Sequence, residues 1–357
     1  MHKLIAINGE SWCRKMTGVE RLAVEVTGYL DSMAQPGEIE LVVPSNAENV
    51  PALHNIRVVR LHTPATFFPK WTQGAFQRYV ITHHALSLDF SNTCPFFCPG
   101  IEFIHDIYSR LYPQDFVSKR DRLICLYADI MYRTIAKRAK HIVTVSEFTK
   151  KTIVDTYHTD PGRISVVYSG IGNYRTIVPD ESVFDRLPGL NGKAYYFTLG
   201  SLSTRKNLAW IAVHAEKHPD EFFVVSGKPI SGVVTPGLEK MKTLKNVLFT
   251  GYLSDAEVKA VLGKCRAFIF PSYFEGYGLP PLEALSCGAP VIISDRTSLP
   301  EIYGSCAHYI DPDNPDVNLD ELLSEHVDAP DALLEKFTLL HTAERLYEII
   351  RQAEDGK

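Results

Sequence analysis

The most constraining stretch of this sequence runs from residue 267 to residue 293, where two short apolar runs enclose a segment rich in glycine and proline. Residues 267–270 and 291–293 are continuous and apolar, which is typical of strands buried on both faces of a parallel sheet. Parallel neighbours cannot be joined by a tight turn, so the intervening chain must form a loop, a helix and a return. The stretch therefore predicts an α/β fold with a doubly wound parallel sheet.

The segment between these strands has the residues of a ligand-binding loop followed by a helix. Gly276 and Gly278 permit close approach of the backbone to a ligand, and the prolines at 280 and 281 suit the first turn of a helix. Gly288 ends that helix, which we expect over about 280–287. Its N-terminus points to the carboxyl edge of the sheet, where open α/β folds bind anions.

Two acidic residues border this expected anion site. Glu275 precedes the helix and Glu283 lies within it. Carboxylates repel an anion but accept hydrogen bonds from hydroxyls, so the pair favours a ligand that carries a phosphate together with a sugar and a ribose. The alternative is that Glu275 is solvated and Glu283 is simply a good helix former.

Two further groups of polar residues follow expected strands. Arg205 and Lys206 lie in the turn after an apolar run that ends near residue 199, where they are placed to neutralise a diphosphate. His105 and Asp106 come directly after the apolar run 101–104, again at the edge where ligands bind. The alternative is that His105 caps the strand end and Asp106 caps a turn.

The first strand is followed by a polar loop and by a helix that we expect to begin near Gly18. Thr17 and Glu20 have the spacing of a capping box. Gly18 either approaches a ligand closely or only adapts the loop to the helix.

Composition and cysteine usage exclude several classes of protein. The chain has 45% hydrophobic and 22% charged residues, as expected of a globular protein, and no signal peptide or membrane-spanning run is recognised. We therefore expect a cytoplasmic location. The seven cysteines are scattered without a C-x-x-C pair, which favours neither a disulfide framework nor a zinc site.

The net charge of −5 conceals a basic N-terminal half and an acidic C-terminal half. Basic and apolar residues alternate at helical spacing between 119 and 138, and an aromatic segment spans 63–71. The helical pattern fits either the outer face of a surface helix or a contact of the N-terminal domain with the inner face of an anionic membrane. The aromatic segment is either a loop folded over the core or an exposed lip that contacts a partner or a membrane.

At this point the sequence resembles a known family. The segment 270–290 with its E-x7-E spacing, together with G-x-L-x-x-R-K-N at 200–207, resembles the retaining GT-B glycosyltransferases of family four (glycosyl transferases group 1). The resemblance implies two Rossmann-like doubly wound domains facing a cleft. We expect an acceptor-side domain over 1–175, a linker over 176–192, a nucleotide-sugar domain over 193–335, and a C-terminal helix over 336–357 that packs back on the first domain.

The resemblance also implies roles for single residues. Catalysis is assigned to Arg205, Lys206, Glu275 and His105, and donor binding to Gly18, Asp106, Tyr252, Leu253, Gly276, Tyr277, Gly278, Leu279 and Glu283. Arg205 and Lys206 would hold the donor diphosphate, Glu275 the donor sugar and Glu283 the ribose. The base would lie against Tyr252 and Leu253.

The implied reaction is transfer of a sugar from a UDP-, GDP- or dTDP-linked donor to a hydroxyl of a glycan or lipid-linked acceptor, with retention of configuration. We expect no metal, no other cofactor and no nucleic acid partner. Alternatives are a sugar-binding protein without turnover and a nucleotide-sugar epimerase of GT-B type. A nicotinamide-dependent oxidoreductase is disfavoured, because no G-x-G-x-x-G follows any expected strand.

Overall fold

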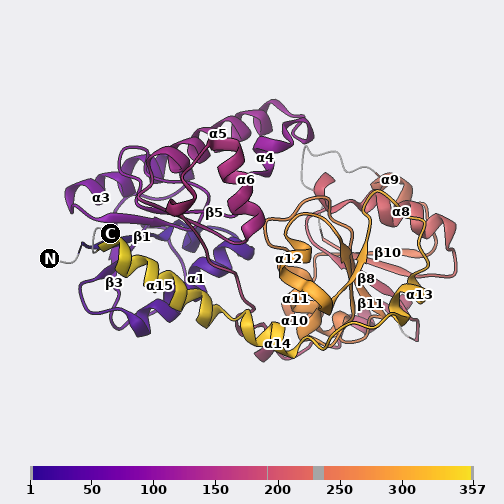
Figure 1. Cartoon of the computed structure of the whole chain (residues 1–357). Helices are drawn as coiled ribbons and strands as arrows, with labels where there is room; N and C mark the ends of the chain where they lie inside the picture. The colour runs from indigo at the N-terminus through magenta and orange to yellow at the C-terminus, as the bar shows by residue number, and fades with distance from the viewer. Residues whose placement is uncertain (1–2, 191, 228–236, 355–357) are drawn as a thin grey trace. The chain divides into compact units, whose positions relative to one another are not determined.

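The computed structural model describes residues 3–190, 192–227 and 237–354 (Figure 1). It contains two compact units. Unit 1 comprises Met1–Leu111, Leu123–Gly170 and Phe337–Lys357, and unit 2 comprises Tyr112–Arg122 and Ile171–Lys336. The chain thus leaves unit 1 after Gly170 and returns to it at Phe337, and residues 176–192 belong to unit 2.

Unit 1 is built on a parallel sheet with the strand order β3-β2-β1-β4-β5-β6-β7. Its strands are β1 (Ile5–Asn8), β2 (Ile39–Val43), β3 (Arg57–Arg60), β4 (Leu86–Asp89), β5 (Ile101–Ile104), β6 (His141–Thr144) and β7 (Ile164–Val166). Ile7 of β1 pairs with Leu41 on one side and Leu88 on the other. The strand order therefore reverses between β1 and β4, which is where doubly wound sheets open a ligand-binding crevice.

The helices of unit 1 cover both faces of this sheet. They are α1 (Gly18–Met33), α2 (Phe68–Lys70), α3 (Gln77–Thr82), α4 (Tyr108–Leu111), most of α5 (Lys119–Arg138), α6 (Glu147–Tyr157) and α15 (Leu339–Glu354), with a π-helical segment (Trp71–Phe76) between α2 and α3. Helix α6 is capped by Ser146, whose side chain accepts from the N–H of Thr149.

Helix α1 begins at the expected residue but without the expected capping box. The Thr17 hydroxyl donates to the carboxylate of Glu20, and no backbone N–H bonds to the Thr17 side chain. The capping-box prediction was wrong, because the Glu20 carboxylate accepts from the Thr17 hydroxyl and the Thr17 oxygen accepts from no backbone N–H.

The C-terminal helix α15 packs against α1 within unit 1, as Figure 1 shows. Leu346 and Ile350 of α15 share a core with Val26 and Leu30 of α1. The apolar pattern near the C-terminus forms two helices, α14 (Asp331–Lys336) and α15, and the first of them belongs to unit 2.

Unit 2 is built on a second parallel sheet with the order β10-β9-β8-β11-β12-β13. Its strands are β8 (Tyr196–Leu199), β9 (Phe223–Ser226), β10 (Val247–Gly251), β11 (Ala267–Phe270), β12 (Val291–Ser294) and β13 (His308–Ile310). Its other helices are α7 (Val183–Arg186), α8 (Leu208–Lys217), α9 (Leu238–Met241), α10 (Asp255–Leu262), α11 (Leu279–Ser286), α12 (Leu299–Tyr303) and α13 (Leu319–Ser324). Strand β8 pairs with β11, so the loops after these two strands emerge side by side.

Candidate functional site

In unit 2, the carboxyl ends of β8 and β11 bring two of the predicted segments together. After β8 the chain forms a 3₁₀ turn (Thr204–Lys206), which Asn207 ends with φ of 54°. After β11 the backbone N–H of Tyr273 donates to the carbonyl of Arg205 over 2.8 Å. The cationic turn and the loop that contains Glu275 are therefore joined by their backbones.

The side chains of Lys206 and Glu275 form an ion pair in this site. Lys206 Nζ lies 2.7 Å from Glu275 Oε1, and the two side chains are only 12% and 6% exposed. The same ammonium group lies 4.4 Å from the centre of the Phe270 ring. Both charges are largely withdrawn from water, and each is stabilised by the other. Glu275 thus holds the Lys206 cation at the edge of the sheet.

A second segment fixes the loop that carries Glu275. The N–H of Glu275 donates to Thr297 Oγ1 over 3.1 Å. The Ser298 hydroxyl lies 3.0 Å from the carbonyl of Glu275 and 3.2 Å from that of Tyr277. Sequence reasoning gave no chemical role to this segment. The sequence signal that could have indicated this contact is the pair of hydroxyl residues Thr297 and Ser298 shortly after β12. At that position they can reach the loop that follows the neighbouring strand.

Gly278 connects this loop to α11. Its φ of 87° is favourable only for glycine, and a Cβ there would lie 2.5 Å from Leu299 Cδ2. The Tyr303 hydroxyl donates to the Gly278 carbonyl. Helix α11 starts at Leu279, and because Pro280 and Pro281 carry no backbone N–H, Leu279 supplies the N–H among the first three residues of the helix. This end of α11 offers backbone donors and a positive dipole end to an anion.

The remaining predicted residues of unit 2 have different degrees of exposure. Glu283 lies in the second turn of α11 and is half-buried. Tyr252 follows β10 and is 58% exposed, whereas Leu253 is 3% exposed and packs inward. Of these two residues, only Tyr252 has an exposed side chain. Helix α10 after them begins with a capping box, in which Ser254 and Glu257 bond reciprocally to each other's backbone N–H.

In unit 1, His105 and Asp106 follow β5 and are tied to their own surroundings. His105 Nε2 lies 2.6 Å from the carbonyl of Phe90, which can only accept, so Nε2 carries the proton. Burial lowers the pKa of His105, which favours the neutral ring with Nδ1 as an acceptor. Asp106 accepts from the N–H of Tyr108 over 2.9 Å and so caps the turn that opens α4.

Gly18 is the first residue of α1. A Cβ built there has no neighbouring atom within 4 Å. Packing among the described residues therefore gives no reason for glycine at this position.

A buried acidic cluster in unit 1 was missed by sequence reasoning. Asn8 Nδ2 donates to Asp89 over 2.6 Å, and Thr72 donates to Glu10 over 2.9 Å. Asp89 and Glu10 are fully buried at the carboxyl ends of β4 and β1, and Arg14 pairs with Glu10. Burial, together with the nearby Glu10, raises the pKa of Asp89 to about 8. Polar residues at the ends of two adjacent apolar strands were the available signal.

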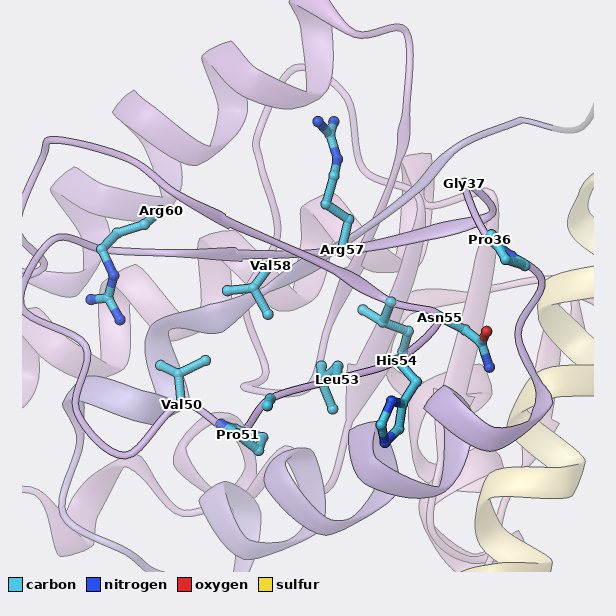
Figure 2. A pocket seen from close by; sticks show the side chains of 12 residues that line it. Pro36, Gly37, Val50, Pro51, Leu53, His54, Asn55, Arg57, Val58 and Arg60 are labelled. Atoms are coloured by element: carbon cyan, nitrogen blue, oxygen red, sulfur yellow. The ribbon is translucent and has the colours of Figure 1, made fainter.

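A surface hollow of about 720 Å³ in unit 1 lies apart from all predicted site residues. Figure 2 shows its lining by the segment 50–58 with Pro36, Gly37 and Arg60. Arg57 is held by an ion pair with Glu40. The hollow follows the edge strand β3 and has no cluster of convergent polar groups.

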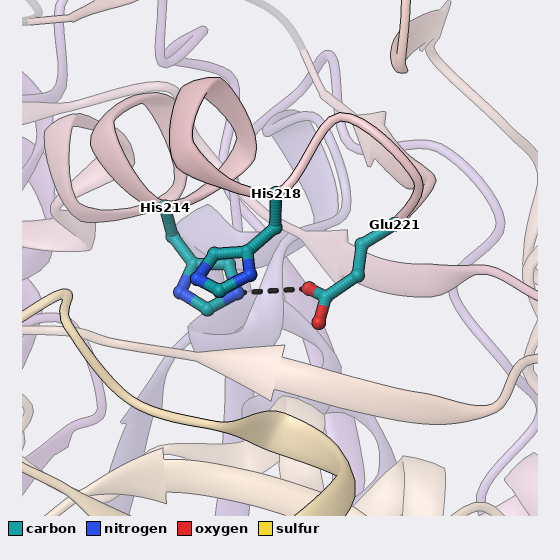
Figure 3. Close-up of side chains that lie close together, drawn as sticks. All are labelled: His214, His218 and Glu221. Atoms are coloured by element: carbon teal, nitrogen blue, oxygen red, sulfur yellow. Dashed lines mark hydrogen bonds and ion pairs between the residues drawn. The ribbon is translucent and has the colours of Figure 1, made fainter.

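His214, His218 and Glu221 lie close together at the end of α8 (Figure 3). His214 Nδ1 lies 2.9 Å from the carbonyl of Pro315, and its Nε2 lies 2.8 Å from Glu221 Oε2. The two imidazole rings stack with centroids 4.3 Å apart. Because both nitrogens of His214 already have protein partners and the rings stack face to face, we interpret the trio as a structural, hydrogen-bonded cluster.

Comparison with known proteins gives the same division of the chain into two parts. The family described as Glycosyltransferase Family 4 matches residues 16–172, and the family described as Glycosyl transferases group 1 matches residues 182–323. The O-antigen chain mannosyltransferase RfbU of Salmonella typhimurium is 28% identical over 65% of this chain and 60% of its own length. The O-antigen chain mannosyltransferase B of Escherichia coli is 27% identical over 74% of this chain and 64% of its own length. The chain thus spans less than two thirds of these relatives.

Solved structures show the same fold at low sequence identity. The sucrose-phosphate synthase of Thermosynechococcus elongatus superposes with a TM-score of 0.73 at 15% identity, over 99% of this chain and 100% of that one. WaaG, a glycosyltransferase involved in lipopolysaccharide biosynthesis, has a TM-score of 0.64 at 15% identity, over 99% and 98%. The chain thus has the two-domain GT-B fold, with a match to Glycosyltransferase Family 4 in its first part followed by a match to Glycosyl transferases group 1 in its second.

Proposed function

We propose that this protein is a retaining glycosyltransferase that moves a hexose from a nucleotide diphosphate donor to a hydroxyl of a glycan acceptor. The observation that carries the proposal is the ion pair between Lys206 and Glu275 at the carboxyl ends of β8 and β11. The site brings together an ammonium group, a carboxylate and the start of α11. The ammonium group and the helix start suit the diphosphate of a nucleotide sugar, and the carboxylate suits the hydroxyls of its sugar.

In the proposed complex, Arg205 and Lys206 neutralise the diphosphate, with Arg205 as a fork of donors and Lys206 as a point charge. The N–H groups of Gly278 and Leu279, at the positive end of the α11 dipole, bind the same anion. Glu275 accepts from a hydroxyl of the donor sugar and Glu283 from the ribose. These cations supply the stabilisation that a metal gives in other phosphate sites, so we propose that no metal or other cofactor is required.

Retention of configuration is proposed to follow from attack on the face of the leaving group. The bond from the anomeric carbon to the phosphate oxygen breaks, the acceptor oxygen bonds to that carbon on the same face, and the acceptor proton passes to the departing phosphate. Glu275 is held by Lys206 and is therefore unsuited to act as a covalent nucleophile. Stabilisation of the leaving diphosphate by Arg205 and Lys206 then supplies most of the rate.

The proposed sugar is mannose and the proposed product a surface polysaccharide, because the two relatives described above are named O-antigen chain mannosyltransferases. We further propose that the acceptor is a glycan, free or lipid-linked, and that the protein works in the cytoplasm at the inner face of the membrane. Among the described helices, none has the length and apolar character that crossing a membrane requires.

A peripheral contact with the membrane is proposed for α5. Leu123, Ile124 and Leu126 of this helix are 67%, 53% and 57% exposed. Lys119 and Arg120 lie at its start. Apolar side chains beside cations on one helix are the chemistry of attachment to an anionic lipid surface.

The test is a transfer assay with purified protein, GDP-mannose, UDP-glucose and a dTDP-linked sugar, each with and without a lipid diphosphate-linked glycan. The proposal predicts acceptor-dependent release of one nucleoside diphosphate, and an α-linked product from an α-linked donor by NMR. Binding of nucleotide without turnover would favour a non-catalytic sugar-binding protein. Conversion of the donor without an acceptor would favour an epimerase.

A further inference from the structure

The loop that joins β11 to α11 is held along one side by hydroxyl groups of the segment that opens α12. Ser298 Oγ lies within hydrogen-bond distance of the carbonyls of Glu275 and Tyr277, at 3.0 and 3.2 Å. The Tyr303 hydroxyl donates to the carbonyl of Gly278. Both Ser298 and Tyr303 are fully buried, and burial keeps the pKa of Tyr303 well above its ordinary value. Its hydroxyl therefore remains a donor at any physiological pH.

These contacts fix the direction of the backbone N–H groups as well as that of the carbonyls. Every peptide bond in the described part of the chain is trans. In a trans peptide plane, the C=O of one residue and the N–H of the next point in opposite directions. Because three carbonyls point toward Ser298 and Tyr303, the N–H groups of Gly276, Gly278 and Leu279 point away from α12. This is the side on which an anion at the start of α11 would be bound.

Thr297 adds a fourth contact and a strained backbone. Its Oγ1 accepts from the N–H of Glu275 over 3.1 Å, and its φ is 59°. A β-branched residue in the left-handed region is an outlier that persists only where the surrounding structure imposes it. The strain places the Thr297 hydroxyl where it orients the residue that pairs with Lys206.

We infer that Ser298 and Tyr303, with Thr297, are positioning residues that preset the donor loop for the diphosphate and the transferred sugar. The inference rests on the proposed function of this site. None of the three residues needs to touch the substrate. They act through the peptide planes of residues 275–279, so their loss should weaken stabilisation of the developing charge more than binding of the nucleoside.

The experiment compares two variants with matched controls in unit 2. Tyr303→Phe removes the hydroxyl that bonds to Gly278, and Tyr309→Phe removes an equivalent bond from a tyrosine hydroxyl to the Gly304 carbonyl, 2.7 Å long. Ser298→Ala removes the double contact, and Ser298→Thr keeps a hydroxyl at the same position. Each variant is measured for kcat and KM with the donor, for affinity toward UDP and GDP by calorimetry, and for thermal unfolding.

The inference predicts that Tyr303→Phe and Ser298→Ala lower kcat by between about 10-fold and 10²-fold, with a smaller change in the KM for the donor. Tyr309→Phe should keep the wild-type kcat, and Ser298→Thr should regain most of it. Wild-type kcat in both variants, or an equal loss in the tyrosine control, would overturn the inference. A variant that unfolds early is judged by its kcat well below its unfolding temperature. If the wild type transfers no sugar with any donor, the proposed function fails. If the wild type transfers sugar and both variants keep its kcat, the positioning role alone fails.

Discussion

Replacement of Lys206 by Met should damage both the stability and the activity of the protein, by separable amounts. Glu275 is 6% exposed, and its partner atom on Lys206 lies 2.7 Å away. Without Lys206, the Glu275 carboxylate stays buried without that cation, which costs about 3–5 kcal/mol in comparable pairs. For a unit of this size, such a loss lowers the unfolding temperature by roughly 6–20 °C. Loss of a cation that stabilises the leaving diphosphate should also lower kcat by about 10²-fold or more.

A matched control is the pair formed by Lys242 and Glu239. Its N–O distance is 2.6 Å, but its side chains are 51% and 85% exposed. Lys242→Met should therefore cost less than about 1 kcal/mol and leave kcat unchanged. The contrast between two pairs of nearly equal length isolates the effect of burial.

The double variant Lys206→Met with Glu275→Gln separates structure from catalysis. It removes both charges, so most of the lost stability should return, since no ionised group is left buried. The kcat should remain low, because the diphosphate still lacks its cation. Thermal unfolding and steady-state kinetics with the donor measure both effects. If the double variant regains wild-type kcat, or if Lys206→Met alone keeps it, the assignment of Lys206 to the leaving group is refuted.

Three further outcomes follow from the structure. Because the pKa of Asp89 is raised to about 8 by burial, its neutral form stabilises unit 1 fully below about 3.8, and this contribution is lost as pH rises toward 8. Urea unfolding should thus show the wild type losing stability relative to Asp89→Asn between pH 5 and pH 8, and a constant difference would contradict this. Leu123→Ser should lower the affinity for anionic vesicles, measured by flotation, by about tenfold. An unchanged affinity would argue against α5 as the membrane contact. Gly170→Ala should lower the unfolding temperature, because the added Cβ would lie 2.2 Å from the backbone just before α15. Gly28→Ala should raise the unfolding temperature slightly, because the added Cβ has open space and glycine is unfavourable inside a helix. The opposite result for the two variants would refute this packing.

The sequence predicted the strands of unit 2 well because they are buried on both faces and therefore continuously apolar. The run 267–270 is β11 as expected, and the helix expected over about 280–287 is α11, Leu279–Ser286. The observed ends of α11 differ from the expected ones by one residue, because proline is tolerated at either of the first two positions of a helix. The Thr17 capping box was wrong, since local spacing does not reveal that the hydroxyl prefers the Glu20 carboxylate.

The contacts that shape the donor loop could not be predicted from local patterns. Lys206 and Glu275 are 69 residues apart, and their ion pair depends on β8 lying next to β11. The hydroxyls of Ser298 and Tyr303 reach that loop only because β12 is the next strand across. Burial of Asp89 with Glu10 likewise depends on the pairing of β4 with β1. Sequence spacing gives the residue types at each strand end, whereas the strand order decides which ends meet.

The most direct test of this account is a crystal structure of the protein with the nucleoside diphosphate that stabilises it most. The account predicts a diphosphate within hydrogen-bond distance of Lys206 Nζ and of the N–H groups of Gly278 and Leu279, with the ribose hydroxyls on Glu283. A diphosphate bound elsewhere, with the bond between Lys206 and Glu275 unchanged and the start of α11 in contact only with water, would contradict it.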